Sequence, residues 1–419
     1  MKKTVLLVAG FISIMAFAGC SKNESQKTDS KIELTLNYYK QENLDGLKNI
    51  ISEFEKENPN IFIQLCHNEG DEQNMALADE GLLYDILQMQ SYARVFEYAS
   101  RGLLMDLTNR PFMNKVLPSS LSAVHWNGKN YGIPMDYAGI GIIYNKDIFA
   151  KYGLTPPSTY AEMQTVCNQL KARGVVPFSP LLGENWSMGH IITMIHTALL
   201  KEKGISSDDF ILRMNAGKGS YGQVNTAKLF GILDFYGKNI SPNPEKINGA
   251  EQQKIFANGK AAMMIQGLWA YMDCLKINPN LNAGFIPFPV YNDSKLNTFY
   301  SDVDSVFCVS SQSSKAKQEA CVKFFEWLLT EKGQRLWMSQ YKLIPPVKGV
   351  DVTSFGGPYV DLMKSVEEKG SMPWAFSQYP SAVFDGPCKD SSWNYMMKNV
   401  TASEVIRAID KKWSEEVTN

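Results

Sequence analysis

The 419-residue sequence has no strong excess of charge of either sign and only four histidines. Its 42 Lys and Arg residues nearly balance 43 Asp and Glu residues, so no strongly basic face is expected for nucleic acid. The four histidines have no cysteine or carboxylate at the spacing of a zinc site. Nucleophile-elbow and His-Glu-x-x-His motifs are also missing. We therefore expect no enzyme, no metal and no cofactor.

Cysteine is sparse and scattered. Apart from Cys20 near the N-terminus, six cysteines show no paired short spacing: Cys66, Cys167, Cys274, Cys308, Cys321 and Cys388. An even number permits disulfides outside the cytoplasm. However, Cys66 and Cys308 lie in strand-like runs and Cys321 lies on the apolar face of a helix, where free cysteine serves as a small hydrophobic residue. We expect mostly unpaired, buried thiols.

Long apolar runs are missing except near the N-terminus, where Met1-Lys2-Lys3 precedes an uncharged apolar segment, Thr4–Ala16. This pattern is typical of a secretory signal peptide, and the segment is shorter than the about 20 apolar residues that span a bilayer. Phe17-Ala-Gly-Cys20 resembles a bacterial lipobox, with Phe17 where Leu is commoner. We expect residues 1–19 to be removed and Cys20 to carry the lipid, palmitate included, that anchors the chain to the outer face of the cell membrane. The alternative is cleavage near Ala18 and free secretion.

The residues after Cys20 predict a short tether and then about two domains. Residues 20–30 are polar and lack periodicity, as in a flexible linker. Residues 31–39 alternate as a strand, 44–54 have apolar residues at helical spacing, and 61–66 form a second strand. Such a βαβ unit is the signature of a parallel sheet with helices on its faces.

Strands and helices continue to alternate along the chain. Further strands are predicted at 84–89, 140–144, 261–266 and 305–310, with a hairpin around the Asn-Gly turn of Trp126–Tyr131. Helices are predicted at 92–100, 160–173, 191–200, 227–236, 251–258 and 316–330. The pattern indicates an α/β fold throughout.

Three blocks of sequence follow one another in a distinctive order. The first is Trp126-Asn-Gly-Lys-Asn-Tyr-Gly-Ile-Pro134, leading through Ile143-Tyr-Asn-Lys-Asp147 to Tyr152-Gly-Leu-Thr-Pro-Pro157. The second is Phe256-Ala-Asn-Gly-Lys-Ala-Ala-Met-Met-Ile-Gln-Gly-Leu-Trp269. The third is Phe324-Phe-Glu-Trp-Leu-Leu-Thr-Glu-Lys-Gly-Gln334, followed by Ile344-Pro-Pro-Val347. In this order they resemble the family 1 extracellular solute-binding proteins of ABC importers, the maltose-binding-protein-like group, over most of residues 31–419.

The resemblance implies an α/β, two-lobed periplasmic-binding-protein-like fold of type II, in which each lobe is a mostly parallel sheet flanked by helices. The N-terminal lobe would take residues 31–138 plus 303–344, and the C-terminal lobe 139–302 plus 345–419. The chain would cross between lobes three times, near Tyr137, Asp302 and Pro345-Pro346. These crossings would form the hinge.

The same resemblance implies a substrate-binding lipoprotein that captures a sugar or oligosaccharide between its lobes and delivers it to the membrane permease of an ABC transporter, acting as a monomer. A ligand that contacts both lobes favours the closed form. Three alternatives stay open. The same fold could bind a polyamine, metal chelate or peptide, the receptor could signal through a sensor kinase, or the chain could be a surface glycosidase, which needs two carboxylates roughly 5–9.5 Å apart.

Trp269 is the first candidate for the binding site. It follows a predicted buried strand and Gly267, so it is expected at the carboxyl edge, where ligands of open α/β sheets bind. Composition alone favours a core residue, whereas in the family the Trp after this Gly stacks on a sugar ring. One face of a pyranose is a patch of C–H groups that packs on an aromatic ring, while its hydroxyls need amide or carboxylate partners.

Other candidates are aromatic, amide and acidic residues at the ends of predicted strands or the starts of loops. They are Tyr38, Tyr39, Gln41, Gln88, Gln90, Asp136, Tyr137, Glu184, Asn185, Trp186, Asp302 and Asp304. Because Tyr38 and Tyr39 are adjacent on a strand, at most one is expected to face the ligand. Gln88 and Gln90 share one face, which is either a site or a solvated edge. Asp302 and Asp304 are either ligand contacts or hinge groups. One of Trp374, Phe384 and Trp393 is a candidate to close the site.

The chain also departs from the family pattern. Tyr-Tyr-Lys-Gln follows the first strand where a Trp or a Gly/Asp-containing loop is usual, and Gln88-Met-Gln90 follows Asp85 where an aromatic or acidic residue is usual. Fewer charged contacts are therefore expected than for a maltose-like sugar, and the identity of the sugar stays open.

Overall fold

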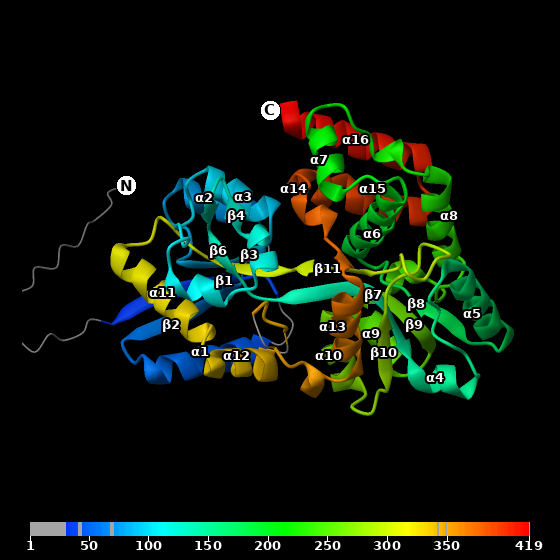
Figure 1. Ribbon diagram of the computed structural model, residues 1–419, viewed down its shortest axis with the longest axis horizontal. Helices are drawn as coiled ribbons and strands as arrows, with labels where there is room; N and C mark the ends of the chain where they lie inside the picture. The colour runs from blue at the N-terminus through cyan, green and yellow to red at the C-terminus, as the bar shows by residue number, and fades with distance from the viewer. Residues whose placement is uncertain (1–30, 41–43, 68–70, 342, 348–349, 419) are drawn as a thin grey trace, which may run out of the picture.

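The computed structural model describes residues 31–40, 44–67, 71–341, 343–347 and 350–418. The predicted signal peptide at 1–19, the predicted lipidation site Cys20, the predicted tether at 20–30 and the candidate Gln41 lie outside the described residues. Within the described ranges, no helix is both long and apolar enough to cross a membrane. Figure 1 shows two lobes side by side, each with a sheet and covering helices.

The first lobe is built on a five-stranded sheet with the strand order β2-β1-β3-β12-β6. Its strands are β1 (Ile32–Tyr38), β2 (Ile61–His67), β3 (Ile86–Gln90), β6 (Gly132–Pro134) and β12 (Ser305–Val309). The predicted βαβ unit is confirmed, since β1 and β2 pair in parallel over their whole length and are joined by α1 (Leu44–Glu57).

Besides the 3₁₀ helices Pro111–Lys115 and Pro118–Ala123, this lobe has α-helices and a short hairpin. They are α2 (Asp71–Asp79), α3 (Ala93–Ser100), the hairpin of β4 (His125–Trp126) and β5 (Lys129–Asn130), α11 (Lys315–Leu328) and α12 (Glu331–Leu336). The apolar faces of α1 and α11 bury a common core against the sheet. The stripe predicted near 316–330 therefore covers the first lobe, although the helix ends at Leu328 and α12 follows.

The second lobe has a six-stranded sheet with the order β13-β11-β7-β9-β8, and β10 also pairs with β7. Its strands are β7 (Tyr137–Asn145), β8 (Val176–Ser179), β9 (Ala261–Gly267), β10 (Ala283–Ile286), β11 (Phe299–Val303) and β13 (Ser371–Met372). Each of the strands predicted at 140–144 and 261–266 is confirmed.

Many helices surround the second sheet, and the outermost of them pack on other helices rather than on the sheet (Figure 1). They are α4 (Lys146–Lys151), α5 (Tyr160–Ala172), α6 (Trp186–Glu202), α7 (Ser207–Asn215), α8 (Thr226–Gly237), α9 (Gly249–Ala257), α10 (Trp269–Ile277), α13 (Gly357–Lys369), α14 (Ser381–Val383), α15 (Lys389–Met396) and α16 (Ala402–Thr418). The central helix α6 is almost entirely buried, which explains why its sequence is apolar on every side.

Both sheets are more mixed than the mostly parallel sheets expected from the sequence. In the first lobe β12 is antiparallel to β3 and β6, and in the second lobe β7 is antiparallel to β9, β10 and β11. The reason is that β7 and β12 each begin where the chain crosses between lobes. They enter their sheets at the hinge and so run against the neighbouring strands that end there.

The chain crosses between the lobes at three places. Met135 and Asp136 join β6 to β7, and Asp304 alone joins β11 to β12. The third crossing follows the π-helical turn Trp337–Tyr341, where Ile344 pairs with Tyr137 and Val347 pairs with Val116. Three strand-like segments thus lie together between the two sheets.

The cysteines of the described chain are free thiols. Cys66 is partly exposed on β2, and the other five are buried. Burial raises the pKa of the Cys308 and Cys388 thiols, so they stay protonated and pack as small hydrophobic residues.

Gly333 provides a test of the packing between α11 and α12. A Cβ atom at this position would collide with the backbone carbonyls of Trp327 and Leu328, whereas a Cβ atom at Gly231, on the exposed side of α8, would meet nothing within 4 Å. We expect Gly333→Ala to lower the free energy of unfolding by about 1–3 kcal/mol through overpacking. Gly231→Ala should raise it by up to about 1 kcal/mol through helix propensity. Urea unfolding followed by circular dichroism checks both, and equal effects of the two substitutions would contradict this packing.

Candidate functional site

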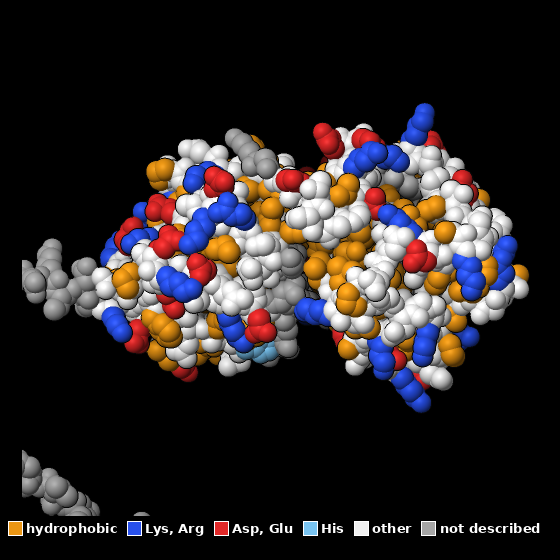
Figure 2. Space-filling view, turned by 90° about the horizontal axis from the view of Figure 1, so that it is seen from below, with side chains coloured by type: hydrophobic (Ala, Val, Ile, Leu, Met, Phe, Trp, Pro, Cys, Tyr) orange, Lys and Arg blue, Asp and Glu red, His pale blue; other side chains and the backbone are white. Residues whose placement is uncertain are grey.

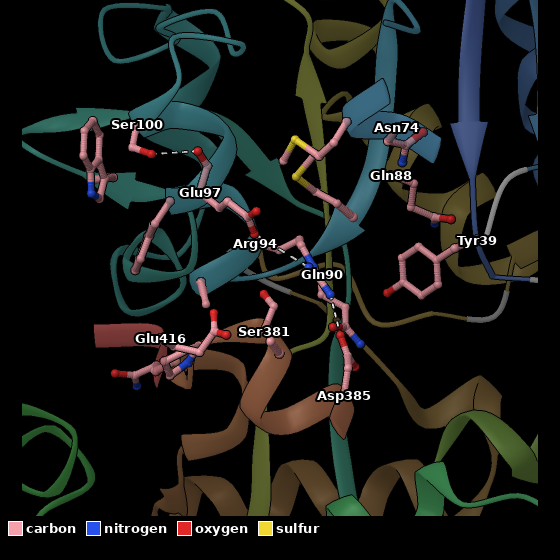
Figure 3. Close-up of a pocket in the computed structure, with 18 of the residues that line it drawn as sticks. Tyr39, Asn74, Gln88, Gln90, Arg94, Glu97, Ser100, Ser381, Asp385 and Glu416 are labelled. Carbon is pink, nitrogen blue, oxygen red and sulfur yellow. Dashed lines mark hydrogen bonds and ion pairs between the residues drawn. The ribbon is translucent and has the colours of Figure 1, made fainter. Parts of the chain in front are cut away.

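A cleft of about 1190 Å³ lies between the two lobes and is lined from both sides (Figure 3). The first lobe contributes Asn37, Tyr39, Asn74, Met75, Gln88, Met89, Gln90, Ala93, Arg94, Phe96, Glu97, Ser100 and Trp126. The second lobe contributes Asn215, Gln378, Pro380, Ser381, Ala382, Asp385, Lys389 and Glu416. Because β1 and β3 are parallel neighbours, their carboxyl ends open into the same edge of the sheet, where ligands of α/β folds bind.

Strand alternation separates Tyr38 from Tyr39. Tyr39 lines the cleft, whereas Tyr38 is only 9% exposed and packs in the core of the first lobe, with its ring centroid 5.1 Å from that of His67. Gln88 and Gln90 both line the cleft. The Gln88 amide Nε2 donates a hydrogen bond of 3.3 Å to the Tyr341 hydroxyl, which links β3 to the start of the third crossing.

An ion pair spans the cleft between the lobes. The Arg94 guanidinium on α3 lies 2.6 Å from the Asp385 carboxylate on the π-helical turn Phe384–Cys388, as the dashed line in Figure 3 shows. Asp385 also pairs with Lys389 at 2.6 Å. The cations of the cleft therefore meet a carboxylate of the same site. With Glu97 and Glu416, the lining carries three carboxylates against two cations.

A buried cluster of charges lies at the hinge. The Lys40 ammonium, just after β1, is 2.5 Å from a carboxylate oxygen of Asp136 and also contacts Asp304. The other oxygen of Asp136 accepts hydrogen bonds from the Ser305 backbone N–H at 2.5 Å and from its hydroxyl at 3.0 Å. The structure thus has Asp136 and Asp304 in the hinge, and neither is among the residues that line the cleft.

The charge state of this hinge cluster follows from its contacts. Burial by itself lowers the pKa of Lys40, but the carboxylates of Asp136 and Asp304 outweigh it and raise this pKa well above the usual value. Lys40 is therefore a permanent cation between two anions. Removing Lys40 would leave two neighbouring carboxylates without a compensating cation.

Asp302 belongs to the same region. Its carboxylate accepts hydrogen bonds from the Tyr92 hydroxyl at 2.9 Å and from the Trp374 backbone N–H at 3.2 Å, which joins the first lobe to the second. Burial raises the pKa of this carboxyl. The sequence left Asp302 and Asp304 between a ligand-binding and a hinge role, and their contacts are those of hinge groups.

An aromatic cluster surrounds His190 near the N-terminus of α6. Its ring centroid lies 4.7–6.5 Å from five rings, those of Trp186, Trp269, Trp374, Phe376 and Phe384. Burial, together with the nearby Lys389 cation, lowers the pKa of His190 to about 3, so its imidazole is neutral. Figure 2 shows that hydrophobic side chains gather on the second lobe beside its junction with the first.

Trp269 is half-buried in this cluster and begins α10. Its six-membered ring occupies the space that a Cβ atom would need at Gly267, so the glycine lets the indole fold back over the end of β9. The ring centroid lies 6.1 Å from that of the buried Trp374 in an edge-to-face contact. Trp269 therefore lies at the carboxyl end of its strand but is not among the residues that line the cleft.

The other candidates from the sequence lie around this cluster and the crossings. The Trp186 indole N–H donates to Glu184 at 2.5 Å, and the Asn185 amide donates to Asp390 at 2.6 Å. The Tyr137 hydroxyl is 2.8 Å from that of Ser301 on the neighbouring strand. Of the thirteen candidates named from the sequence, Tyr39, Gln88 and Gln90 line the cleft, within the described chain.

Several lining residues were not found from the sequence. Arg94 could have been predicted from the sequence, because a helix that directly follows a strand begins at the carboxyl edge of the sheet. Asp385, Gln378 and Ser381 lie in short, irregular helical turns, where hydrophobic periodicity provides no signal. Asn215 and Glu416 come from the ends of α7 and α16, which are brought to the cleft only by the packing of the second lobe.

Comparison with known proteins agrees with this architecture. A chitin oligosaccharide binding protein superimposes with a TM-score of 0.80, at 20% identity over 93% of this chain and all of the other. A solved complex of the solute-binding protein RafE with raffinose has a TM-score of 0.77, at 20% identity over 91% of this chain and 98% of the other. These likenesses confirm the two-lobed α/β fold.

Among curated proteins, the multiple sugar-binding protein of Streptococcus mutans is 25% identical over 369 residues, which covers 83% of each chain. The melibiose/raffinose/stachyose-binding protein MelE of Bacillus subtilis is 24% identical over 302 residues, 69% of this chain and 68% of that protein. The family model described as bacterial extracellular solute-binding protein matches residues 49–355, well over half of the chain. The chain therefore belongs to the bacterial extracellular solute-binding proteins, a family of binding proteins rather than enzymes.

Proposed function

We propose that this protein is the substrate-binding component of an ABC importer, which captures a sugar or oligosaccharide between its lobes and delivers it to a membrane permease. The observation that carries the proposal is the large cleft between the lobes, lined by aromatic side chains of the first lobe and by amide side chains of both. A ligand that contacts both walls binds the closed form better than the open form and so shifts the equilibrium toward closure.

The chemistry of the walls suits a carbohydrate. Three rings, those of Tyr39, Phe96 and Trp126, offer faces to the C–H patches of pyranoses. The amides of Asn37, Asn74, Gln88, Gln90, Asn215 and Gln378 both donate and accept hydrogen bonds, as sugar hydroxyls require. The lining carries two cations, Arg94 and Lys389, and three carboxylates. These charges nearly cancel, so they do not favour a polyamine or another strongly charged solute.

The names of the relatives support the same ligand class. They include proteins that bind multiple sugars, melibiose, raffinose, stachyose and chitin oligosaccharides. Two further relatives are named as binding proteins of ABC transporters. Such proteins act outside the cytoplasm, and we propose that a lipid on Cys20 holds this one near its permease as a monomer, with residues 20–30 as the tether.

We also propose the division of the lobes at 31–138 plus 303–344 and 139–302 plus 345–419. The strands support these bounds to within two residues, since β6 ends at Pro134 and β12 begins at Ser305 in one sheet, while β7 begins at Tyr137 and β11 ends at Val303 in the other. Within this frame Tyr39 and Gln90 are proposed contacts from the first lobe. Trp269 and Trp186 are proposed contacts from the aromatic cluster of the second lobe.

The role of Tyr39 can be tested with melibiose, raffinose and stachyose. We expect Tyr39→Ala to weaken binding of whichever of these sugars binds by about 1.5–3 kcal/mol, the value of burying one large side chain. Isothermal titration calorimetry measures the change, with Phe62→Ala as the matched control, because Phe62 is 50% exposed on the edge strand β2 and does not line the cleft. If Tyr39→Ala binds as tightly as the control, Tyr39 is not a contact.

Trp269 is tested by the substitution Trp269→Ala. In the unaltered protein, a sugar at 100 times its Kd should raise the free energy of unfolding by about 2.7 kcal/mol and so raise the melting temperature. Trp269→Ala should abolish this rise, because the sugar loses its stacking partner. Circular dichroism should show an unchanged helix content. A variant that keeps its thermal shift would make Trp269 a core residue that supports Trp374.

The lipid anchor is tested by mass spectrometry of the mature N-terminus. We expect the chain to begin at Cys20 with the added mass of lipid, and Cys20→Ala to be released from the membrane fraction because it lacks an acceptor thiol. A mature chain that begins elsewhere, without lipid, would favour free secretion after cleavage near Ala18.

A further inference from the structure

The cleft extends well beyond the ends of β1 and β3. Residues Ala93, Arg94, Glu97 and Ser100 of α3 all line it, at the spacing of one helix face. From Ala93 to Ser100 this face covers about 10 Å at a rise of about 1.5 Å per residue. In Figure 3, Tyr39 lies at one end of the cleft, and Ser100 and Glu416 lie toward the other. The cleft is therefore an elongated groove with an inner and an outer end.

Two aromatic side chains line the cleft beyond Tyr39. Trp126 and Phe96 are both half-buried, and each packs with one side on the core of the first lobe. Trp126 is supported by Tyr131 at a centroid distance of 6.2 Å, and Phe96 by Tyr92 at 6.3 Å in an edge-to-face contact. Each ring is thus held by the core while part of it borders the groove.

The backbone around Trp126 is well suited to hold the ring in place. Trp126 pairs with Lys129 in the hairpin of β4 and β5, and the two residues between them, Asn127 and Gly128, have φ values of 46° and 77°. Positive φ at both central positions is the geometry of a tight type I′ hairpin, which Asn-Gly favours. The hairpin presents the indole at the border of the groove with little freedom to move.

The second lobe provides polar groups for the same groove. Asn215 at the end of α7 and Glu416 in the last turn of α16 line the cleft together with Trp126 and Phe96. The volume of about 1190 Å³ exceeds the about 300–1,000 Å³ of pockets for drug-sized ligands. A ligand of one sugar ring would leave much of this groove unoccupied.

We propose that Phe96 and Trp126 form an outer subsite, which binds a distal ring of an oligosaccharide and thereby sets the preferred chain length. The inference rests on the proposed function and deepens it. The rings stack on the C–H face of that sugar unit, and Ser100, Asn215 and Glu416 bind its hydroxyls when the lobes close. Short sugars bind at the inner end near Tyr39 and gain nothing from the outer subsite.

The experiment measures binding over a ladder of chain length by calorimetry: galactose, melibiose, raffinose and stachyose, and then chitin and xylan oligosaccharides. Trp126→Ala should weaken binding of the longest bound sugar about tenfold, which is about 1.4 kcal/mol. It should change the affinity of the shortest bound sugar of the same ladder less than about twofold. Trp126→Phe should restore most of the loss, and Phe62→Ala should change neither affinity.

A second variant covers the case in which Trp126→Ala fails to fold. Ser100 is exposed, so Ser100→Arg leaves the core intact while filling the outer end of the groove. It should weaken the longest sugar selectively as well. Equal losses for all lengths, or no loss at all, would overturn the outer subsite while leaving the proposed function intact. If the unaltered protein binds no sugar of any ladder, the proposed function itself is wrong, and the outer subsite with it.

Discussion

The arrangement of the two lobes depends on the buried contact of Lys40 with Asp136 and Asp304. These carboxylates lie 96 and 264 residues further along the chain, one in the first crossing and one in the second, and both contact the same ammonium. A buried charge that loses its partner is strongly destabilising, so the three groups hold the crossings together as a unit. Ser305 completes the cluster by donating two hydrogen bonds to Asp136. The two sheets are thereby connected at a fixed hinge.

This hinge explains where the cleft lies and why the lobes on either side of it can change their spacing. Strands β1, β3 and β6 end beside it, so polar residues after those strands gather at one edge. Away from the hinge, the Arg94–Asp385 pair ties the lobes across the cleft, and Asp385 is 39% exposed. A partly exposed ion pair contributes only about 0–1 kcal/mol, so it does not lock the lobes. A ligand that bridges both walls can therefore control the spacing of the lobes at a modest energetic cost.

Much of the fold could be predicted from the sequence because its signals are local. Alternation predicted β1, apolar spacing predicted α1 and α11, and the Asn-Gly turn predicted the β4–β5 hairpin. The mixed strand directions were missed, since they arise when β7 and β12 enter their sheets from the hinge. Of the site, strand alternation correctly limited the pair Tyr38 and Tyr39 to one residue that lines the cleft. The sequence correctly placed Asp136 and Trp269 near the ends of strands. Only their packing in the folded protein reveals that Asp136 is a hinge carboxylate and that the Trp269 indole folds over Gly267.

The sequence by itself determined the α/β class, the division into strands and helices, and the family resemblance, because these follow from periodicity and from motifs a few residues long. Only the tertiary structure decided which side chains share the cleft. Tyr39, Arg94, Trp126, Asp385 and Glu416 are spread over almost the whole chain, and no local pattern relates them. Their meeting depends on the three crossings, two of which are held together by one buried lysine. The meeting of these side chains is therefore a property of the folded chain, because Lys40 reaches both aspartates only after both sheets have formed.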